Sequence, residues 1–269
     1  MNRIKELRIS LGDRIASLFA RGDDLMPPKR LNAMIGGGDF KALGREFLGY
    51  FTQFGGLKPE DRVLDVGCGC GRMAVPLMTY LSQKGSYEGF DIMGVGIDWC
   101  QRHIAARDPR FHFQRADVYN QYYNPNGKCQ SVEYRFPFPD GSFDFFFLTS
   151  VFTHMLAADM QHYLAEAARI LKPGGRGMIS YFLVNPESQA LMEGGESVFH
   201  PQIVREDCMI LREDKPEETV TYHETFVRRC FERSGLEFVE PVHYGSWSGR
   251  KQFLSFQDLI LAVKRPAER

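Results

Sequence analysis

The sequence lacks any run of about 18 apolar residues, the length that a membrane-spanning helix needs, so we expect no transmembrane segment. It also lacks an excess of charge, because 33 Lys and Arg stand against 34 Asp and Glu. Proteins that coat nucleic acids usually carry a clear basic excess, which neutralises phosphates. The balance therefore gives no strong nucleic-acid signal, although it does not exclude a local basic patch.

The sequence also has no Cys-x-x-Cys pair among its six cysteines, so a structural zinc site has little support and we expect no bound metal. Cys68 and Cys70 are separated by one residue in a glycine-rich run, which is a poor frame for a disulfide. The first residues are charged and lack the long apolar stretch of a secretory signal. Reduced thiols in the cytoplasm are the simplest interpretation.

Residues 2–20 have the spacing of an amphipathic helix. Its apolar positions are Ile4, Leu7, Leu11, Ile15 and Leu18. Such a helix could pack on the core, pair with a second copy in a homodimer, or lie on an anionic membrane surface. Glu6 and Asp13 dilute its basic face and favour packing. With a second helix at 40–54, ended by Gly55-Gly56, it forms an expected N-terminal helical extension over residues 1–55.

From residue 61 onward, short apolar runs alternate with helical segments. The predicted strands are 62–66, 86–91, 111–116, 143–149 and 177–183, and the predicted helices are about 72–83, 95–107 and 157–171. Strictly alternating strands and helices indicate a doubly wound α/β fold with a parallel sheet and right-handed crossovers. The chain ends differently, with a helix at about 223–234 and strands at 238–243 and 257–264. The loop between these two strands is too short for a helical crossover, so they should be antiparallel.

Residues 185–222 interrupt this pattern with several prolines and glycines. An insertion of this length in a compact domain is usually functional. We therefore interpret residues 56–269 as one domain that carries a lid or substrate-recognition insertion at about 185–222.

A glycine-rich loop follows the first predicted strand, in the order Asp65-Val66-Gly67-Cys68-Gly69-Cys70-Gly71-Arg72. Glycines let the backbone turn tightly and approach a ligand closely. The third glycine comes one residue sooner than in the usual dinucleotide fingerprint. In addition, Asp65 would repel a pyrophosphate but could support a cationic, amine-bearing ligand. These two features disfavour a nicotinamide-dependent oxidoreductase.

Two further acids end the next two strands. Asp91, at the end of 86–91, could accept both hydroxyls of a ribose. Asp117 follows 111–116, where a carboxylate could accept from the exocyclic amine of adenine. Single acids at strand ends are often helix caps, but three in register beside a glycine loop favour a nucleoside site.

These motifs resemble those of the class I S-adenosylmethionine-dependent methyltransferases. The resemblance rests on DVGCGCG (65–71), GFDI (89–92), ADV (116–118), FDFFFLTSVFTHM (143–155) and ILKPGG (170–175). It covers roughly residues 40–184 and extends more loosely through the last two strands. It implies a Rossmann-like, seven-stranded, mostly parallel sheet with strand order 3-2-1-4-5-7-6 and an antiparallel last strand.

The resemblance also implies S-adenosyl-L-methionine as cofactor and assigns residues to it. Gly67, Cys68, Gly69 and Gly71 would line its methionine portion, Asp65 would hold its amine and Asp91 its ribose. Ile92 would pack on the adenine, whose edge Asp117 and Val118 would meet, and Leu148 and Thr149 would border the transferred methyl. Arg72 would either cap the following helix or contact the cofactor carboxylate.

The residue that takes a proton from the acceptor is less clearly indicated. His154, just beyond the fourth strand, is the leading candidate, with helix capping or cofactor contact as the other interpretation. His200, His223 and His243 are alternatives. Tyr181, Tyr222 and Trp247 could line an acceptor pocket or simply pack, and Arg250 beside Trp247 could grip a sugar or an acidic group.

The sequence therefore predicts a methyltransferase that acts on a small molecule, with O-methylation of a sugar, glycoconjugate or secondary metabolite favoured. Two alternatives stay open: RNA or protein as acceptor, and a non-catalytic module that binds the cofactor. The near-neutral charge and the long insertion favour a small acceptor.

Overall fold

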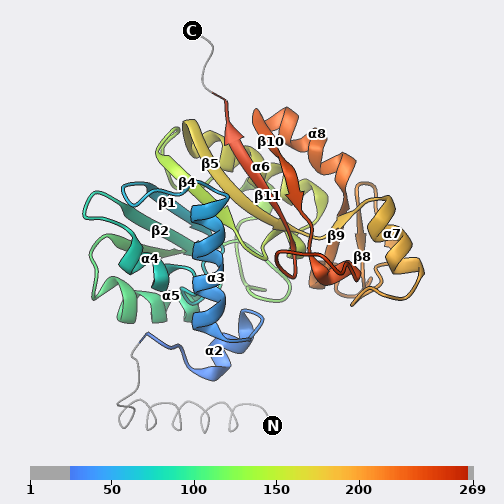
Figure 1. Ribbon diagram of the computed structural model, residues 1–269. Helices are drawn as coiled ribbons and strands as arrows, with labels where there is room; N and C mark the ends of the chain where they lie inside the picture. The colour runs from blue at the N-terminus through green and yellow to red at the C-terminus, as the bar shows by residue number, and fades with distance from the viewer. Residues whose placement is uncertain (1–24, 266–269) are drawn as a thin grey trace, which may run out of the picture.

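The computed structural model describes residues 25–265 (Figure 1). The helix predicted at 2–20 lies outside the described residues, so its packing, and a homodimer formed through it, stay predictions. In the described part of the chain, no helix combines the length and apolarity that crossing a membrane requires.

A seven-stranded sheet forms the centre of the molecule, in the order β10-β11-β5-β4-β1-β2-β3. The strands are β1 (Arg62–Val66), β2 (Ser86–Asp91), β3 (Phe111–Arg115), β4 (Phe143–Leu148), β5 (Leu171–Tyr181), β10 (Leu236–His243) and β11 (Asp258–Lys264). Neighbours from β3 to β5 pair in parallel, whereas β11 is antiparallel to both β5 and β10. The predicted strand order and the antiparallel last strand are confirmed.

Helices cover both faces of this sheet (Figure 1). The α-helices of the described chain are α2 (Lys29–Met34), α3 (Phe40–Gln53), α4 (Ala74–Tyr80), α5 (Gly94–Cys100), α6 (Ala157–Ile170), α7 (Pro186–Glu193) and α8 (Glu224–Ser234), of which α7 lies in the insertion. The helix predicted at 95–107 continues beyond α5 as a π-helical turn, Gln101–Ala105.

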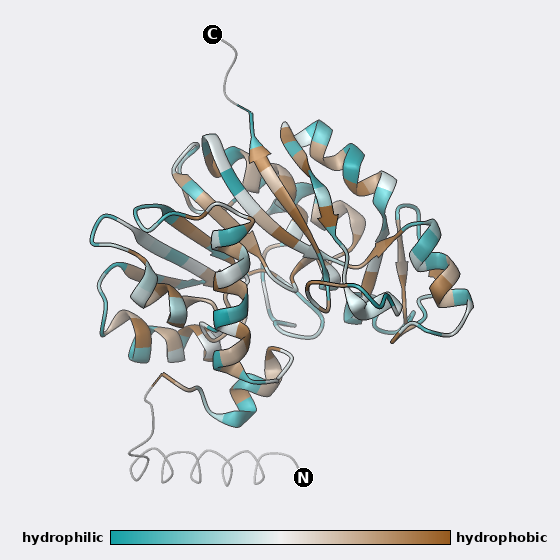
Figure 2. Ribbon diagram, in the orientation of Figure 1, coloured by the Kyte–Doolittle hydropathy of each residue, from teal (hydrophilic) through white to brown (hydrophobic). Residues whose placement is uncertain are grey.

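Strand alternation divides the core into two layers. Phe145 and Phe147 of β4 pack with α3, α4 and α5, whereas Phe146 and Leu148 point to the opposite face, toward α6 and α8. All four side chains are buried, as expected for a sheet covered on both sides. Figure 2 shows hydrophobic residues along the strands of this sheet.

Strand β5 begins earlier than predicted, because Leu171 already pairs with Phe143 across an irregularity that precedes Arg176. The Pro173-Gly174-Gly175 turn lies within this irregular stretch. Prolines and glycines interrupt an alternating pattern, so the sequence placed the start of this strand only at residue 177.

A second, four-stranded sheet that the sequence did not predict is formed by the insertion together with the two residues that precede it. Its order is β6-β9-β8-β7, with β6 (Leu183–Val184), β7 (Ile203–Val204), β8 (Cys208–Ile210) and β9 (Val220–His223). Two- and three-residue strands are too short to produce a readable alternation of polar and apolar residues. A 3₁₀ turn, η4 (Pro216–Glu218), precedes β9.

Arg169 of α6 fixes the segment that leads into β4. It donates two hydrogen bonds to Glu166 (2.8 and 2.7 Å) and others to the carbonyls of Phe136 and Phe138 (3.0 and 2.8 Å). Replacing Arg169 by Ala leaves two carbonyls without this donor and leaves the Glu166 carboxylate with the N–H of Phe136 but without a cation. We expect a loss of about 3 kcal/mol in the free energy of unfolding, measured by urea denaturation.

Arg135 provides the matched control for this prediction. It contacts Asp140 at 3.5 Å, a residue that Arg169 also contacts, but its side chain is 72% exposed. Exposed ion pairs contribute little, so Arg135→Ala should change stability by less than about 0.5 kcal/mol. If Arg169→Ala and Arg135→Ala lost the same free energy of unfolding, the hydrogen bonds of Arg169 would have no special structural role.

Candidate functional site

The glycine loop follows β1 and leads into α4. Gly67, Gly69 and Gly71 have φ values of +80°, +57° and +78°, a region that side chains strongly disfavour. A Cβ at Gly67 would lie 2.4 Å from Val151, and one at Gly69 would lie 2.8 Å from Ile35. Glycine is therefore the residue that fits each of these three positions, because the backbone is left-handed there and neighbouring side chains occupy the space that a Cβ would need.

Asp91, at the end of β2, ties the glycine loop to its neighbouring strand. Its Oδ2 accepts from the Gly69 N–H at 2.7 Å, and its Oδ1 accepts from the Met93 N–H at 2.7 Å. Burial raises the pKa of this carboxyl, and both N–H donors oppose that rise. Each oxygen keeps a second lone pair and the side chain is partly exposed, so the carboxylate can accept from hydroxyls of a ligand.

Asp65 lies beneath the same loop and is 1% exposed. Its Oδ2 accepts from the Tyr87 hydroxyl at 2.6 Å, whereas its Oδ1 is buried without a hydrogen-bond partner among the described residues. Burial raises the pKa of this carboxyl to about 8. A buried acceptor without a donor is costly, so this oxygen suits a ligand that brings its own N–H group.

Arg72, one residue after the loop, contacts the N-terminal segment. Its Nη2 donates to the side chain of Asn32 (3.0 Å) and to the carbonyl of Gly37 (2.6 Å). Its Nε is buried and has no hydrogen-bond partner in the part of the chain that the structure describes. A carboxyl oxygen and a guanidinium nitrogen, each without a hydrogen-bond partner among the described residues, thus come from the residues that precede and follow the glycine loop.

The other residues predicted to contact the cofactor are distributed over the same sheet edge. Asp117 is exposed, and Ile92 and Thr149 are half-buried. Cys68, Val118 and Leu148 are buried. Burial raises the pKa of the Cys68 thiol well above its ordinary value, which keeps it protonated.

Ser150 is a residue that sequence reasoning missed. It follows β4 and has φ +60°, the only positive φ of a non-glycine residue among the described ones. Its N–H donates to Ser180 at 2.7 Å, and its hydroxyl accepts from Gln257 at 2.9 Å. Left-handed backbone at a non-glycine residue often marks a functional site, but no sequence signal reveals it, because its partners lie 30 and 107 residues away.

His154 lies in a 3₁₀ turn just beyond β4, three residues after the Val151 that covers Gly67. Its Nδ1 is 3.0 Å from the carbonyl oxygen of Glu217 in the insertion. A carbonyl can only accept, so Nδ1 carries the proton and Nε2 keeps a lone pair. Burial lowers the pKa of this imidazole, which favours the neutral form that a general base needs.

The other candidate acceptor residues pack or are exposed. Tyr181, Tyr222 and Trp247 are fully buried, so they belong to the core and do not line an open pocket. His200 and His223 are exposed, and His243 packs against the ring of Phe54 with centroids 4.5 Å apart.

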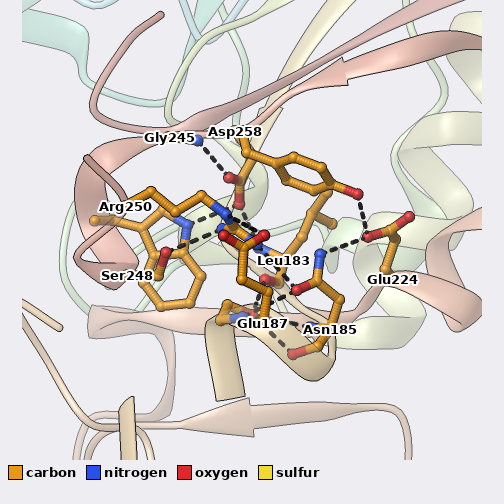
Figure 3. Close-up of polar contacts among 11 residues, drawn as sticks. Leu183, Asn185, Glu187, Glu224, Gly245, Ser248, Arg250 and Asp258 are labelled. Carbon is orange, nitrogen blue, oxygen red and sulfur yellow. Dashed lines mark hydrogen bonds and ion pairs between the residues drawn. The ribbon is translucent and has the colours of Figure 1, made fainter. Parts of the chain in front are cut away.

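Trp247 and Arg250, which the sequence offered either as ligand-binding or as packing residues, are both held by internal partners. Trp247 donates its Nε1 to Asp258 at 2.7 Å, and the same carboxylate accepts from the N–H groups of Leu183 and Gly245 (Figure 3). Arg250 is 7% exposed and stacks over Tyr244. These side chains are engaged by internal partners rather than presented to a ligand.

The same network fastens the insertion to the sheet (Figure 3). Arg250 donates to Asn185 at 3.0 Å, and Asn185 and the hydroxyl of Tyr244 both donate to Glu224 at 2.9 and 2.8 Å. Beside it lies a cavity of about 550 Å³. It is lined by Val184, Asn185, Pro186, Glu187, Gln189, His223, Glu224, Thr225 and Tyr244. The base of the insertion is therefore anchored and does not swing freely.

No group of three or more His, Cys, Asp or Glu side chains within residues 25–265 is arranged to hold a metal ion. The residues around the glycine loop fit an organic ligand instead. The buried Asp65 oxygen and the Arg72 Nε match the ammonium and carboxylate of an amino acid, and Asp91 matches a ribose.

Residues 63–175 match a family described as a methyltransferase domain. The chain is 30% identical over 142 residues to the 27-O-demethylrifamycin SV methyltransferase of Amycolatopsis mediterranei, covering 53% of this chain and 46% of that one. It is 31% identical over 124 residues to the ubiquinone/menaquinone biosynthesis C-methyltransferase of Geotalea daltonii, covering 46% of each. The chain thus spans less than half the length of these curated relatives.

The fold also has close counterparts among solved structures. The magnesium protoporphyrin IX methyltransferase of Synechocystis, solved with bound S-adenosylhomocysteine, superimposes with a TM-score of 0.54 at 14% identity. The alignment covers 95% of this chain and 94% of that one. At this identity the likeness concerns the fold.

Proposed function

We propose that the chain is a class I S-adenosylmethionine-dependent methyltransferase, because residues 63–175 match a methyltransferase domain, and that it transfers the methyl group of S-adenosylmethionine to a hydroxyl of a small molecule. The observation that carries this proposal is the orientation of His154. A half-buried imidazole, which is held through Nδ1 and whose neutral form is favoured by burial, follows the strand beside the glycine loop. An alcohol acceptor needs such a base.

The residues of the glycine loop would hold the cofactor. Asp65 offers its unpartnered oxygen to the amino group, and Asp91 offers lone pairs to the ribose. When bound, S-adenosylmethionine supplies an electrophilic methyl group on a sulfonium. The exposed carboxylate of Asp117 is our proposed partner for the adenine edge.

His154 would accept the proton of the acceptor hydroxyl at Nε2 as the oxygen attacks the methyl carbon. The Glu217 carbonyl would stabilise the imidazolium that results, because Nδ1–H donates to it. The insertion would thereby orient the base. Holding donor and acceptor in line is the other main contribution of the protein.

A small, uncharged acceptor fits the balance of charge and the anchored insertion better than a nucleic acid does. Sugars, glycoconjugates and secondary metabolites are the classes that we favour, and the rifamycin relative acts on a compound of the last kind. We infer a cytoplasmic location from the six cysteines, all of which are free thiols.

The test uses methyl-labelled S-adenosylmethionine with a panel of neutral sugars, glycosides and phenolic compounds. Label recovered in an alkali-stable methyl ether supports the proposal. Label recovered in total RNA or protein would favour those acceptors instead. Absence of S-adenosylmethionine binding in calorimetry would contradict the whole assignment.

Replacing His154 by Ala should lower kcat for the acceptor so identified by about 100- to 10,000-fold, the usual contribution of a general base. Binding of S-adenosylhomocysteine should change by less than about twofold, since His154 is not placed among the cofactor residues. Because the pKa of His154 lies below its ordinary value, wild-type kcat should stay level down to about pH 6.5. His200→Ala, at an exposed position, is the control, and an unchanged kcat in His154→Ala would exclude the proposed base.

A further inference from the structure

The loop that follows β3, residues 116–130, is folded on itself around Asn120. The Oδ1 of Asn120 accepts from the backbone N–H groups of Tyr122 and Tyr123 at 3.0 and 2.9 Å. The backbones of Asn120 and Asn124 exchange two further hydrogen bonds, at 3.2 and 3.1 Å. Both asparagines are buried. The middle of this loop is therefore held by contacts of its own.

The side chain of Glu217 fastens this loop to the insertion. Glu217 belongs to the 3₁₀ turn η4, and its Oε2 accepts from Asn120 Nδ2 at 3.0 Å and from the N–H of Gln121 at 3.3 Å. The amide of Asn120 has one orientation that suits its neighbours, because its Oδ1 already faces two N–H donors. Its Nδ2 must then donate, so the position of Glu217 requires an acceptor.

The backbone of Glu217 holds the proposed base. Its carbonyl oxygen lies 3.0 Å from Nδ1 of His154, so one residue contacts the loop through its side chain and the imidazole through its main chain. The ring of Tyr123 also lies edge to face against His154, with centroids 6.1 Å apart. The loop after β3, η4 and the turn that carries His154 thus meet at one place.

The carbonyl of Glu217 decides which nitrogen of His154 carries the proton. In a neutral imidazole, the hydrogen bond made by one nitrogen sets the protonation of the other. Without this acceptor the proton could lie on Nε2, which would then offer an N–H to the acceptor hydroxyl and could not take its proton. Because η4 is only three residues long, contacts outside the turn fix the position of this carbonyl.

We propose that Glu217 is a positioning residue for His154. Asn120 and Gln121 hold its carboxylate, and this keeps its carbonyl in line with Nδ1 of His154, so that Nε2 stays available to the acceptor. The loop that holds Glu217 also carries Asp117, which we assign to the adenine, so one loop supports both the cofactor and the base. This inference rests on the proposed function, since it takes His154 to be the base.

The first test reads the tautomer of His154 directly and needs neither cofactor nor acceptor. In protein with isotope-labelled histidine nitrogens, nuclear magnetic resonance at about pH 8, where an imidazole is neutral, shows which ring nitrogen carries the proton. His154→Ala identifies the signal among the seven histidines. We expect the Nδ1–H form in the wild-type protein and a substantial fraction of the Nε2–H form in Glu217→Ala. Glu217→Gln keeps a carbonyl oxygen that can accept from both donors, so it should retain the Nδ1–H form.

The second test separates this role from a merely structural one. Glu217→Ala should lower kcat by about 10- to 100-fold while KM and the Kd of S-adenosylhomocysteine change by less than about twofold, because the lost contact orients the base and binds neither substrate. Glu217→Gln should recover most of that loss. Glu213→Ala, at an exposed position of the same insertion, is the control and should change neither kcat nor the His154 tautomer.

Asn120→Asp tests the same contact from the side of the loop, whatever the Glu217 variants do to folding. It keeps the oxygen that accepts from Tyr122 and Tyr123 but replaces the donor to Glu217 by a carboxylate, so it should shift the tautomer of His154 as Glu217→Ala does. An unchanged tautomer in both variants, or equal losses of kcat in Glu217→Gln and Glu217→Ala, would overturn the proposal. If the wild-type protein transferred no methyl group to a hydroxyl, the proposed function would fail, whereas the tautomer would still report on Glu217.

Discussion

Asp91→Ala is expected to weaken the binding of S-adenosylhomocysteine by about 100-fold or more. Hydrogen bonds to a charged group contribute about 1.5–3 kcal/mol each, and a ribose offers two hydroxyls to this carboxylate. The variant also leaves the Gly69 and Met93 N–H groups without their acceptor, so the loop loses the contact that shapes it. Isothermal titration calorimetry measures the change.

Asp98→Ala serves as the control for this experiment. Asp98 lies one element further along, in α5, and is exposed. Asp98→Ala should leave the affinity for S-adenosylhomocysteine unchanged. Asp91→Asn keeps one carbonyl acceptor, so its affinity should lie between those of the wild-type protein and Asp91→Ala. An affinity in Asp91→Ala equal to that of the wild-type protein would contradict the ribose assignment while leaving the fold intact.

The sheet could be predicted from the sequence because its signals are local. β1 and β2 begin and end at the predicted residues. β1 is a short buried run followed by a glycine, and β2 is a short, mostly buried run whose last residue is Asp91. The order of the strands followed from the resemblance, and the antiparallel last pair followed from the length of its loop.

What the sequence could not predict depends on distant partners. The sequence suggested that Trp247 and Arg250 bind a ligand, because they are close in sequence. In the structure they donate hydrogen bonds to Asp258 and Asn185, which lie 11 and 65 residues away in the sequence. The insertion's strands are formed by two to four residues each, and such short strands are defined by their pairing rather than by their composition.

The candidate site was likewise predictable from the sequence only in part. The types and spacing of Asp65, Asp91 and the glycines were sufficient to predict a nucleoside site. The Tyr87 hydroxyl on Asp65 and the Asn32 side chain on Arg72 were not predictable, because they come from a neighbouring strand and from the N-terminal segment. These contacts determine the electrostatics of the site, and the second prediction depends on them.

Binding of S-adenosylhomocysteine should strengthen by about 50-fold between pH 6 and pH 8, roughly ninefold from pH 6 to pH 7 and about fivefold from pH 7 to pH 8. Burial raises the pKa of Asp65 to about 8, so below that pH the carboxyl of the free protein is protonated. An ammonium favours the ionised carboxylate, and binding must therefore release this proton. Calorimetry in buffers of different ionisation enthalpy would detect the released proton directly.

5′-Methylthioadenosine isolates the contribution of Asp65 from that of Asp91, whose pKa burial also raises. This ligand keeps the ribose but has no ammonium, so its affinity should show a much smaller dependence on pH. Asp65→Asn should abolish the steep dependence for S-adenosylhomocysteine. The same steepness in Asp65→Asn, or an equal slope for both ligands, would exclude Asp65 as the partner of the amino group.

The stability of the ligand-free protein should respond to pH in the opposite sense. The folded pKa of Asp65 lies above the unfolded value of 3.8, so between these values the folded state binds the proton that the unfolded state has lost. Stability therefore falls as the pH rises from about 4 toward 8. Asp65→Asn has no carboxyl to ionise, so its stability should lack this dependence on pH. The difference in melting temperature between Asp65→Asn and the wild-type protein should therefore shift in favour of the variant from pH 5 to pH 8. Opposite pH trends of stability and affinity, both lost in Asp65→Asn, are expected of a buried carboxyl that is protonated in the free protein and becomes charged when the ligand's ammonium binds.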